Sequence, residues 1–218
     1  MKIQSIQIAL FFKNLMLDRP DLRFRTLIDH FSEVFNTMPT QFELPLGTPN
    51  DVPFMILKSK NNLSNCNVSR SRIDFISEDL NYVENQEKLL QFIEDVSSVI
   101  EIKNFGFITT YFEENDNASK HILQKYFKFD NNVNIKEASL RFNNPIKLNK
   151  ESFNFHIAIS DVKQQNMHTN DTREGLLIQK DINNISLNVK NEVYTSSKIQ
   201  SLFKSASQFL YSSKVDVK

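Results

Sequence analysis

Residues 152–160 read Ser-Phe-Asn-Phe-His-Ile-Ala-Ile-Ser, and large apolar side chains alternate with small or polar ones at every step. Successive side chains of a β-strand point to opposite faces of a sheet, so a period of two predicts a strand with one buried face. Such alternation favours antiparallel pairing, with one face of the sheet covered by helices and the other in contact with water. The buried face would carry Phe153, Phe155, Ile157 and Ile159, and the other face Asn154, His156 and Ala158.

The same alternation recurs along the chain. Residues 3–17 are the most tempting candidate for a signal peptide or a membrane-spanning helix, but Gln4, Ser5 and Gln7 interrupt the apolar residues, so the segment predicts a buried strand. Further strands are expected at Ile3–Phe12, Pro53–Ser59, Val68–Ile76, Phe105–Glu113, Ile135–Phe142 and within Gly175–Val189.

Four other segments place apolar residues three and four positions apart, the spacing that builds one face of a helix. They are Pro20–Met38, Tyr82–Ile100, Ala118–Phe127 and Ser197–Leu210. The strands and helices together predict an α+β fold, in which a mostly antiparallel sheet is covered by about four helices.

The order of the expected elements repeats. It runs strand, helix, strands, helix up to Lys103, and the same order starts again at Phe105. This order indicates two similar βαββα-type halves, residues 1–103 and 104–218, that pack as one compact unit. The halves share no residue motif, so the expected repeat depends on the order of elements alone.

Composition limits the classes of function. The 19 phenylalanines predict a large aromatic core, and Cys66, the single cysteine, has no second thiol in the chain to pair with. A chain without disulfides is typical of a reducing compartment, so a cytoplasmic location is expected. The formal net charge of zero removes the general electrostatic argument for a membrane surface or a nucleic acid as partner.

The sequence contains no recognisable cofactor or metal motif. Three glycines, Gly47, Gly106 and Gly175, cannot form a glycine-rich phosphate cradle, so no nucleotide cofactor is expected. The four histidines are scattered without ligand spacing, and no metal site is expected.

A candidate loop site consists of His156, His168 and Asp171, where the strand of residues 152–160 leads into the polar loop Gln164–Thr172. Together with Asp161, these residues are the part of the sequence that most resembles a metal-binding cluster. A strand histidine beside a solvated loop explains the same pattern, and an unrecognised hydrolase is the catalytic alternative.

A second candidate site is the strand face of Arg70, Arg72 and Asp74. Alternation would place the two arginines on one face, about 6–7 Å apart, where they could grip a phosphate backbone or an acidic peptide. In the alternative interpretation this face is solvated, and Arg72 and Asp74 partly neutralise each other.

Four short segments, Gln41–Pro45, Arg72–Phe75, the helix from Tyr82 and Asn104–Phe107, follow one another in a recognisable order. This order resembles a sporadically distributed family of uncharacterised bacterial proteins, often described near mobile elements. The resemblance covers most of the chain, and it implies no activity.

These observations favour a non-enzymatic protein–protein interaction protein, acting as a homodimer or as a subunit of a bacterial complex linked to mobile elements or phage defence. Exposed sheet edges would provide the binding surface. A nucleic-acid-binding regulatory module that uses Arg70 and Arg72 is the alternative.

Overall fold

The computed structural model describes residues 2–15, 28–29, 31, 34–79, 86–127, 137–165, 172–184 and 192–212. These residues form one antiparallel sheet of nine strands in the order β2-β3-β4-β5-β1-β6-β9-β8-β7. The α+β class and the antiparallel sheet expected from the alternation are confirmed. The strands are β1 (Lys2–Phe12), β2 (Thr40–Gln41), β3 (Pro53–Lys58), β4 (Ser64–Ser69), β5 (Arg72–Ser77), β6 (Ile102–Glu114), β7 (Ser139–Leu148), β8 (Glu151–Gln165) and β9 (Thr172–Asn183).

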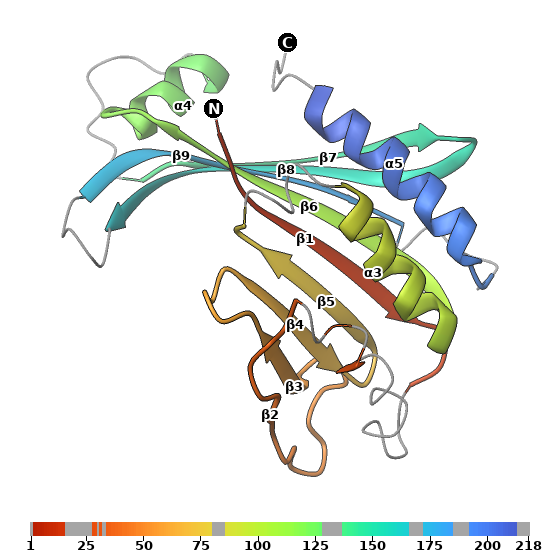
Figure 1. Ribbon diagram of the computed structural model, residues 1–218. Coiled ribbons are helices and arrows are strands. Elements are labelled where there is room, and N and C mark those ends of the chain that lie inside the picture. The colour runs from red at the N-terminus through yellow and green to blue at the C-terminus, as the bar shows by residue number, and fades with distance from the viewer. Residues whose placement is uncertain are drawn as a thin grey trace.

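Three helices are described in full: α3 (Gln86–Val99), α4 (Ala118–Phe127) and α5 (Ser196–Ser212). The expected count of about four is therefore not confirmed, because most of the segment Pro20–Met38 lies outside the described residues. Helices α3 and α5 lie side by side over β1 and β6, and α4 packs over β7, β8 and β9 (Figure 1). No helix in the described part of the chain is long and apolar enough to cross a membrane.

Apolar side chains of the central strands form the core beneath α3 and α5. Ile8 of β1 lies between Phe75 of β5 and Phe107 of β6, and all three are nearly inaccessible to solvent. The rings of Phe107 and Phe203 meet edge to face, 4.7 Å apart, and this contact joins α5 to the sheet. The expected aromatic core and the buried positions of Phe153 and Phe155 are confirmed.

A buried lysine also positions α5. The ammonium of Lys180, on β9, donates to the carbonyl of Leu210 over 3.1 Å and lies 4.8 Å from the centre of the Tyr111 ring. A cation at the last carbonyls of a helix interacts favourably with the helix dipole. Lys180 is 1% exposed, and burial lowers the pKa of its ammonium.

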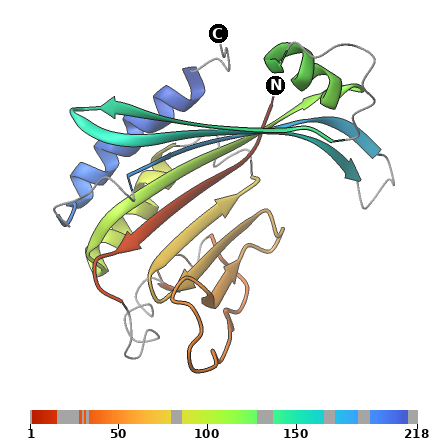
Figure 2. The ribbon, with the colours of Figure 1, turned by 180° about the vertical axis from the view of Figure 1, so that it is seen from behind.

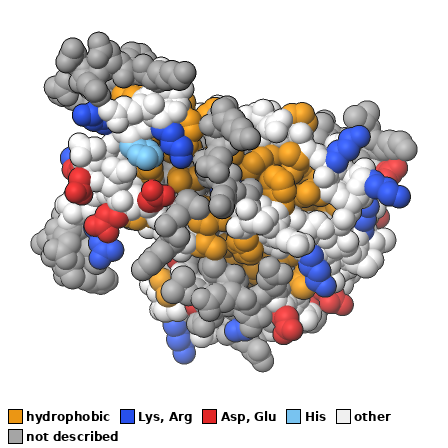
Figure 3. Space-filling view, turned by 90° about the horizontal axis from the view of Figure 1, so that it is seen from above, with side chains coloured by type: hydrophobic (Ala, Val, Ile, Leu, Met, Phe, Trp, Pro, Cys, Tyr) orange, Lys and Arg blue, Asp and Glu red, His pale blue; other side chains and the backbone are white. Residues whose placement is uncertain are grey.

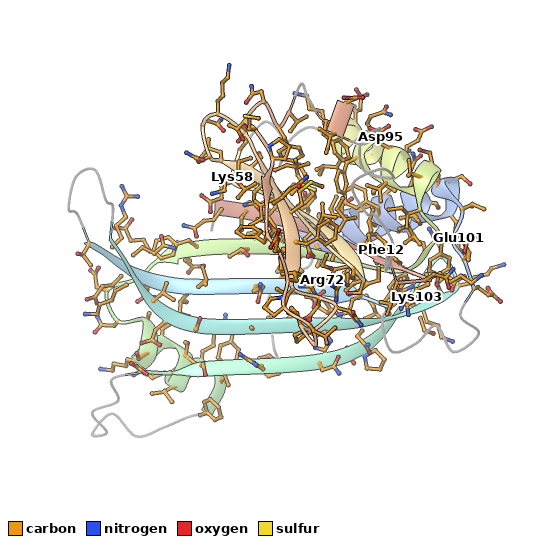
Figure 4. All side chains as sticks on the ribbon, turned by 90° about the horizontal axis from the view of Figure 1, so that it is seen from below. Phe12, Lys58, Arg72, Asp95, Glu101 and Lys103 are labelled. Atoms are coloured by element: carbon orange, nitrogen blue, oxygen red, sulfur yellow. The ribbon has the colours of Figure 1, made fainter. Side chains whose placement is uncertain are left out.

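The helices leave the other face of the sheet uncovered in the described part of the chain. The view from behind shows β1, β5 and β6 with α3 and α5 beyond them (Figure 2), and the view from below shows β7, β8 and β9 with no helix in front of them (Figure 4). We call this side the open face. The residues of β1 that point to it are the odd-numbered ones from Ser5 to Phe11, because Ile6, Ile8 and Leu10 enter the core.

The expected strand Val68–Ile76 is wrong, because the structure contains two strands there, β4 and β5, joined by a turn at Arg70 and Ser71. The hydroxyl oxygen of Ser69 accepts hydrogen bonds from the backbone N–H groups of Ser71 and Arg72, at 3.3 and 3.1 Å. The side chain therefore supplies the acceptor for N–H groups that have no strand partner in the turn. The second half also differs from the expected βαββα unit, since three strands, β7, β8 and β9, lie between α4 and α5.

Gly175 provides a test of the packing. A Cβ atom at this residue of β9 would overlap with the carbonyl oxygen of Glu113 and would lie 2.6 Å from the Phe112 ring, so Gly175→Ala forces both to move. We expect a loss of about 1–3 kcal/mol in the free energy of unfolding, measured by urea denaturation. Gly106→Ala is the matched control, since its Cβ would find no atom closer than 3.6 Å. Equal stability of Gly175→Ala and the wild type would contradict the packing around β6 and β9.

Candidate functional site

The open face carries a row of small and polar residues across the middle of the sheet. Asp74, Ala9, Gly106, Asn183 and Asn154 lie opposite one another on β5, β1, β6, β9 and β8. Asp74, Ala9 and Asn183 are 4–7% exposed. Polar groups at this depth need hydrogen-bond partners or a ligand.

Asp74 is held in an ion pair. Its carboxylate lies 2.9 Å from the Nε atom of Arg72 and accepts a hydrogen bond of 3.2 Å from the Gln7 amide, while the Arg72 guanidinium lies 5.8 Å from the centre of the Phe11 ring. Burial raises the pKa of the Asp74 carboxyl, and the nearby Arg72 and Gln7 oppose that shift. The mutual neutralisation of Arg72 and Asp74 is confirmed, but the solvated face is wrong, because Asp74 is buried.

Arg70 is not part of this face. It lies in the turn between β4 and β5, so the expected pair of arginines on one strand face is wrong. In Figure 4, Arg72 lies on the side of the sheet away from α3, whereas Phe12 lies toward the helices. A single arginine already bonded to a carboxylate does not favour the phosphate-gripping interpretation.

His156 also points to the open face, and its cross-strand neighbour is a carboxylate. It lies opposite Asp181 in the pairing of β8 with β9, and a positive charge on His156 would lower the pKa of Asp181. One oxygen of Asp181 accepts from the amide of Asn183 over 3.0 Å, and the other, Oδ1, is buried without a hydrogen-bond partner. Burial is the larger effect on Asp181 and raises the pKa of its carboxyl.

The two groups of candidate residues share one face but do not form one site. Three strands separate β5 from β8, so Asp74 and His156 lie four strand spacings apart, about 19 Å along the sheet. His168 and Asp171 lie outside the described residues. Sequence reasoning missed Asp181 and Gly106, because an acidic residue and a glycine at strand positions have the pattern of ordinary solvated sites.

Asp161, the remaining member of the candidate cluster, has a structural role. Its two carboxylate oxygens accept from the hydroxyl of Ser119, on α4, and from the backbone N–H of Ala138. This carboxylate therefore ties the start of α4 to the start of β7, beside an open cavity of about 780 Å³. No group of three or more His, Cys, Asp or Glu side chains within the described ranges could hold a metal ion.

Strand β7, of ten residues, is the last strand of the sheet on its side, and no strand in the described part of the chain pairs with its outer edge. It joins β8 through Asn149 and Lys150, both with positive φ, as in a two-residue type I′ turn. In such a hairpin the pair next to the turn, Leu148 with Glu151, is hydrogen-bonded, and every second pair follows it. The backbone groups of the odd-numbered residues of β7 therefore point away from β8, toward the edge.

Pro145 is one of these outward-pointing residues and has no N–H to offer a partner strand. Prolines on edge strands occur at such positions, where they limit pairing with other chains. The alternation of hydrogen-bonded pairs along the hairpin agrees with a hydrogen bond at its far end, in which the N–H of Asp161 donates to the carbonyl of Ala138. The continuous outward edge is therefore the part of β7 before Pro145.

Apolar side chains accompany this edge on the helix side of the sheet. Figure 3 shows hydrophobic side chains at the surface in the middle of the view from above, the side on which α4 and α5 lie. Leu140, Phe142 and Ile157 are half-buried, and Phe127, at the end of α4, is half-exposed.

No protein-family model matches the chain, and no curated protein matches it significantly.

The burial of the Asp74 carboxyl predicts how stability depends on pH. The folded-state pKa of Asp74 lies above its unfolded value, so this group contributes stability that is present below about pH 3.9 and lost as pH rises through the folded-state pKa. The free energy of unfolding of Asp74→Asn, minus that of the wild type, should therefore increase as pH rises through this range. A difference that stays constant with pH would contradict the burial of an ionisable group here.

Removal of the Arg72 cation should lower the free energy of unfolding at neutral pH. Arg72→Ala leaves the Asp74 carboxylate buried without its partner, which costs about 3 kcal/mol. The substitution also raises the folded-state pKa of Asp74, because Arg72 holds that pKa down, so the pH range over which stability is lost extends to higher pH. Urea denaturation between pH 3 and pH 8 measures both effects, with Arg173→Ala, at an exposed arginine of β9, as control.

Proposed function

We propose that this chain is a non-enzymatic protein-binding protein that associates with a second copy of itself through the first part of β7. The observation that carries the proposal is the outer edge of β7, which has no partner strand among the described residues, is apolar on one side and is interrupted by Pro145. Strand addition to such an edge supplies backbone hydrogen bonds, and the alternate side chains supply specificity.

The sequence of the edge is compatible with pairing to itself. In a two-fold antiparallel arrangement centred on Leu140, this residue faces Leu140 of the second copy, and Ala138 faces Phe142 of the second copy. The odd-numbered residues then provide the hydrogen bonds, with Ser139 opposite Arg141 of the second copy. All apolar pairs fall on the helix side, and Pro145 remains outside the paired segment.

Helix α4 supports the same arrangement. It packs over the start of β7, where Tyr126 lies 6.1 Å from Phe142, ring centre to ring centre. Phe127, at its end, is 50% exposed. A two-fold axis through Leu140 would bring the helices α4 of both copies toward each other above the joined sheets. Their exposed aromatic side chains would then be buried together, which stabilises a dimer.

We further propose that residues 1–103 and 104–218 are a duplicated unit. The strand order β3-β4-β5-β1 on one side of the sheet centre recurs as β7-β8-β9-β6 on the other. The edges differ, because β2 has two residues and extends the first half beyond β3, whereas β7 has ten residues and is followed by no further strand that the structure describes. This asymmetry favours β7 as the associating edge.

Two proline substitutions test the association. Arg141→Pro removes an outward N–H inside the paired segment, and Lys147→Pro removes one beyond Pro145; neither N–H bonds to β8. We expect wild type and Lys147→Pro to be dimers at tens of micromolar and Arg141→Pro to be a monomer, because the pairing loses its central hydrogen bonds. Size-exclusion chromatography with light scattering gives the mass, and circular dichroism checks that each variant is folded.

A monomeric wild type would refute self-association, and a folded Arg141→Pro variant that remains dimeric would refute the β7 edge as its site. Phe142→Lys provides a second variant that leaves the backbone groups intact. It places a charge among the facing apolar side chains and should also yield a monomer.

A further inference from the structure

The outer edge of the sheet carries two charged side chains of opposite sign. Among residues 137–143, only Glu137 and Arg141 are charged at neutral pH, and both residues are exposed. They are four positions apart, so along an extended chain they lie on one face, opposite to the helix side that carries Leu140. Within the described part of the chain, neither side chain forms an ion pair.

The pairing inside the sheet gives these two charges no partner of opposite sign. Arg141 faces Ala158 of β8. The N–H of Asp161 donates to the carbonyl of Ala138, so the pairing with β8 continues just beyond the start of β7. The same register places Glu137 opposite Val162. Both charges therefore have an uncharged neighbour on β8.

The two-fold pairing of β7 with a second copy would bring the two charges together. When Leu140 faces Leu140 of the second copy, Ser139 faces Arg141 of the second copy and Glu137 faces Asn143 of the second copy. Glu137 and Arg141 of the second copy are then diagonal neighbours on one face, about 7–8 Å apart, which long side chains can span. Because the axis repeats every contact, the dimer contains this pair twice.

We infer that Glu137 of each copy forms an ion pair with Arg141 of the other copy, and that these two ion pairs set the orientation of the association; the inference rests on the β7 edge proposed above. A parallel, in-register pairing would place each charge opposite the same charge of the second copy, and like charges in that position destabilise a sheet. Antiparallel pairing replaces these repulsions by attractions. The apolar side chains on the helix side supply affinity, and the charges select the orientation.

Reversal of each charge tests this inference. Glu137→Lys and Arg141→Glu each turn both ion pairs of a homodimer into repulsive pairs, and both variants keep the backbone N–H groups of the edge. We expect each variant alone to have a dimer dissociation constant at least about tenfold above that of the wild type. In an equimolar mixture of the two variants, both pairs of the heterodimer are again of opposite sign. Its dissociation constant should therefore return to within about threefold of the wild-type value.

Lys147→Glu is the matched control for Arg141→Glu. Lys147 is exposed and lies on the same strand and the same face as Arg141, but it follows Pro145 and lies outside the paired segment. This variant should dimerise as tightly as the wild type. Sedimentation equilibrium in about 50 mM salt measures all the dissociation constants, because exposed charges are screened less at low ionic strength. Circular dichroism checks that each variant is folded.

The outcomes separate the ion pairs from the edge itself. A monomeric wild type overturns both proposals. A dimeric wild type overturns the ion pairs alone if Glu137→Lys and Arg141→Glu dimerise as tightly as it does, or if their mixture associates no better than each variant by itself. Equal weakening by Lys147→Glu would reflect net charge rather than a specific contact, and it also overturns the ion pairs.

Discussion

The pairing of β1 with β6 is the contact on which the rest of the structure depends. These two strands form the centre of the sheet, and every other described strand is attached to one of them, directly or through its neighbours. Their core-facing side chains, such as Ile8 and Phe107, lie opposite each other and are covered by α3 and α5. A shift of one residue in this register would turn the apolar side chains of a strand to the open face.

The same pairing creates the chemistry of the opposite face. When Ile8 and Phe107 enter the core, Ala9 and Gly106 must face away from it, so two small residues lie together at the centre of the sheet. Polar residues of β5 and β9 then border them on either side. The core and the polar row are therefore two consequences of one register, and the hydrophobic effect that fixes the core also positions Asp74 and Asn183.

Much of the fold was predictable, because burial imposes a period of two on strands and of 3.6 on helices. The strand of residues 152–160, the helix Ala118–Phe127 and the aromatic core follow from these periods alone. The turn at Arg70 was missed, although the alternation changes phase across it: the core residues Cys66 and Val68 are even-numbered, whereas Ile73 and Phe75 are odd-numbered. The candidate site was predicted only in part: Arg72, Asp74 and His156 do lie on one face, but Arg70 does not, and the carboxylate beside His156 comes from a distant part of the sequence.

The sequence by itself determined the burial of alternating apolar residues such as Phe153 and Phe155, because apolar side chains leave water and their spacing records the local geometry. The burial of Asp74 and Lys180 was decided by the tertiary structure. Only the tertiary structure decided which buried or polar residues meet. Asp181 lies opposite His156, and Gly106 lies beside Ala9, because strands far apart in the sequence pair in one register, and no local pattern specifies that register. The position of β7 at the end of the described sheet has the same origin, since a strand is an edge only through the order in which the sheet is assembled.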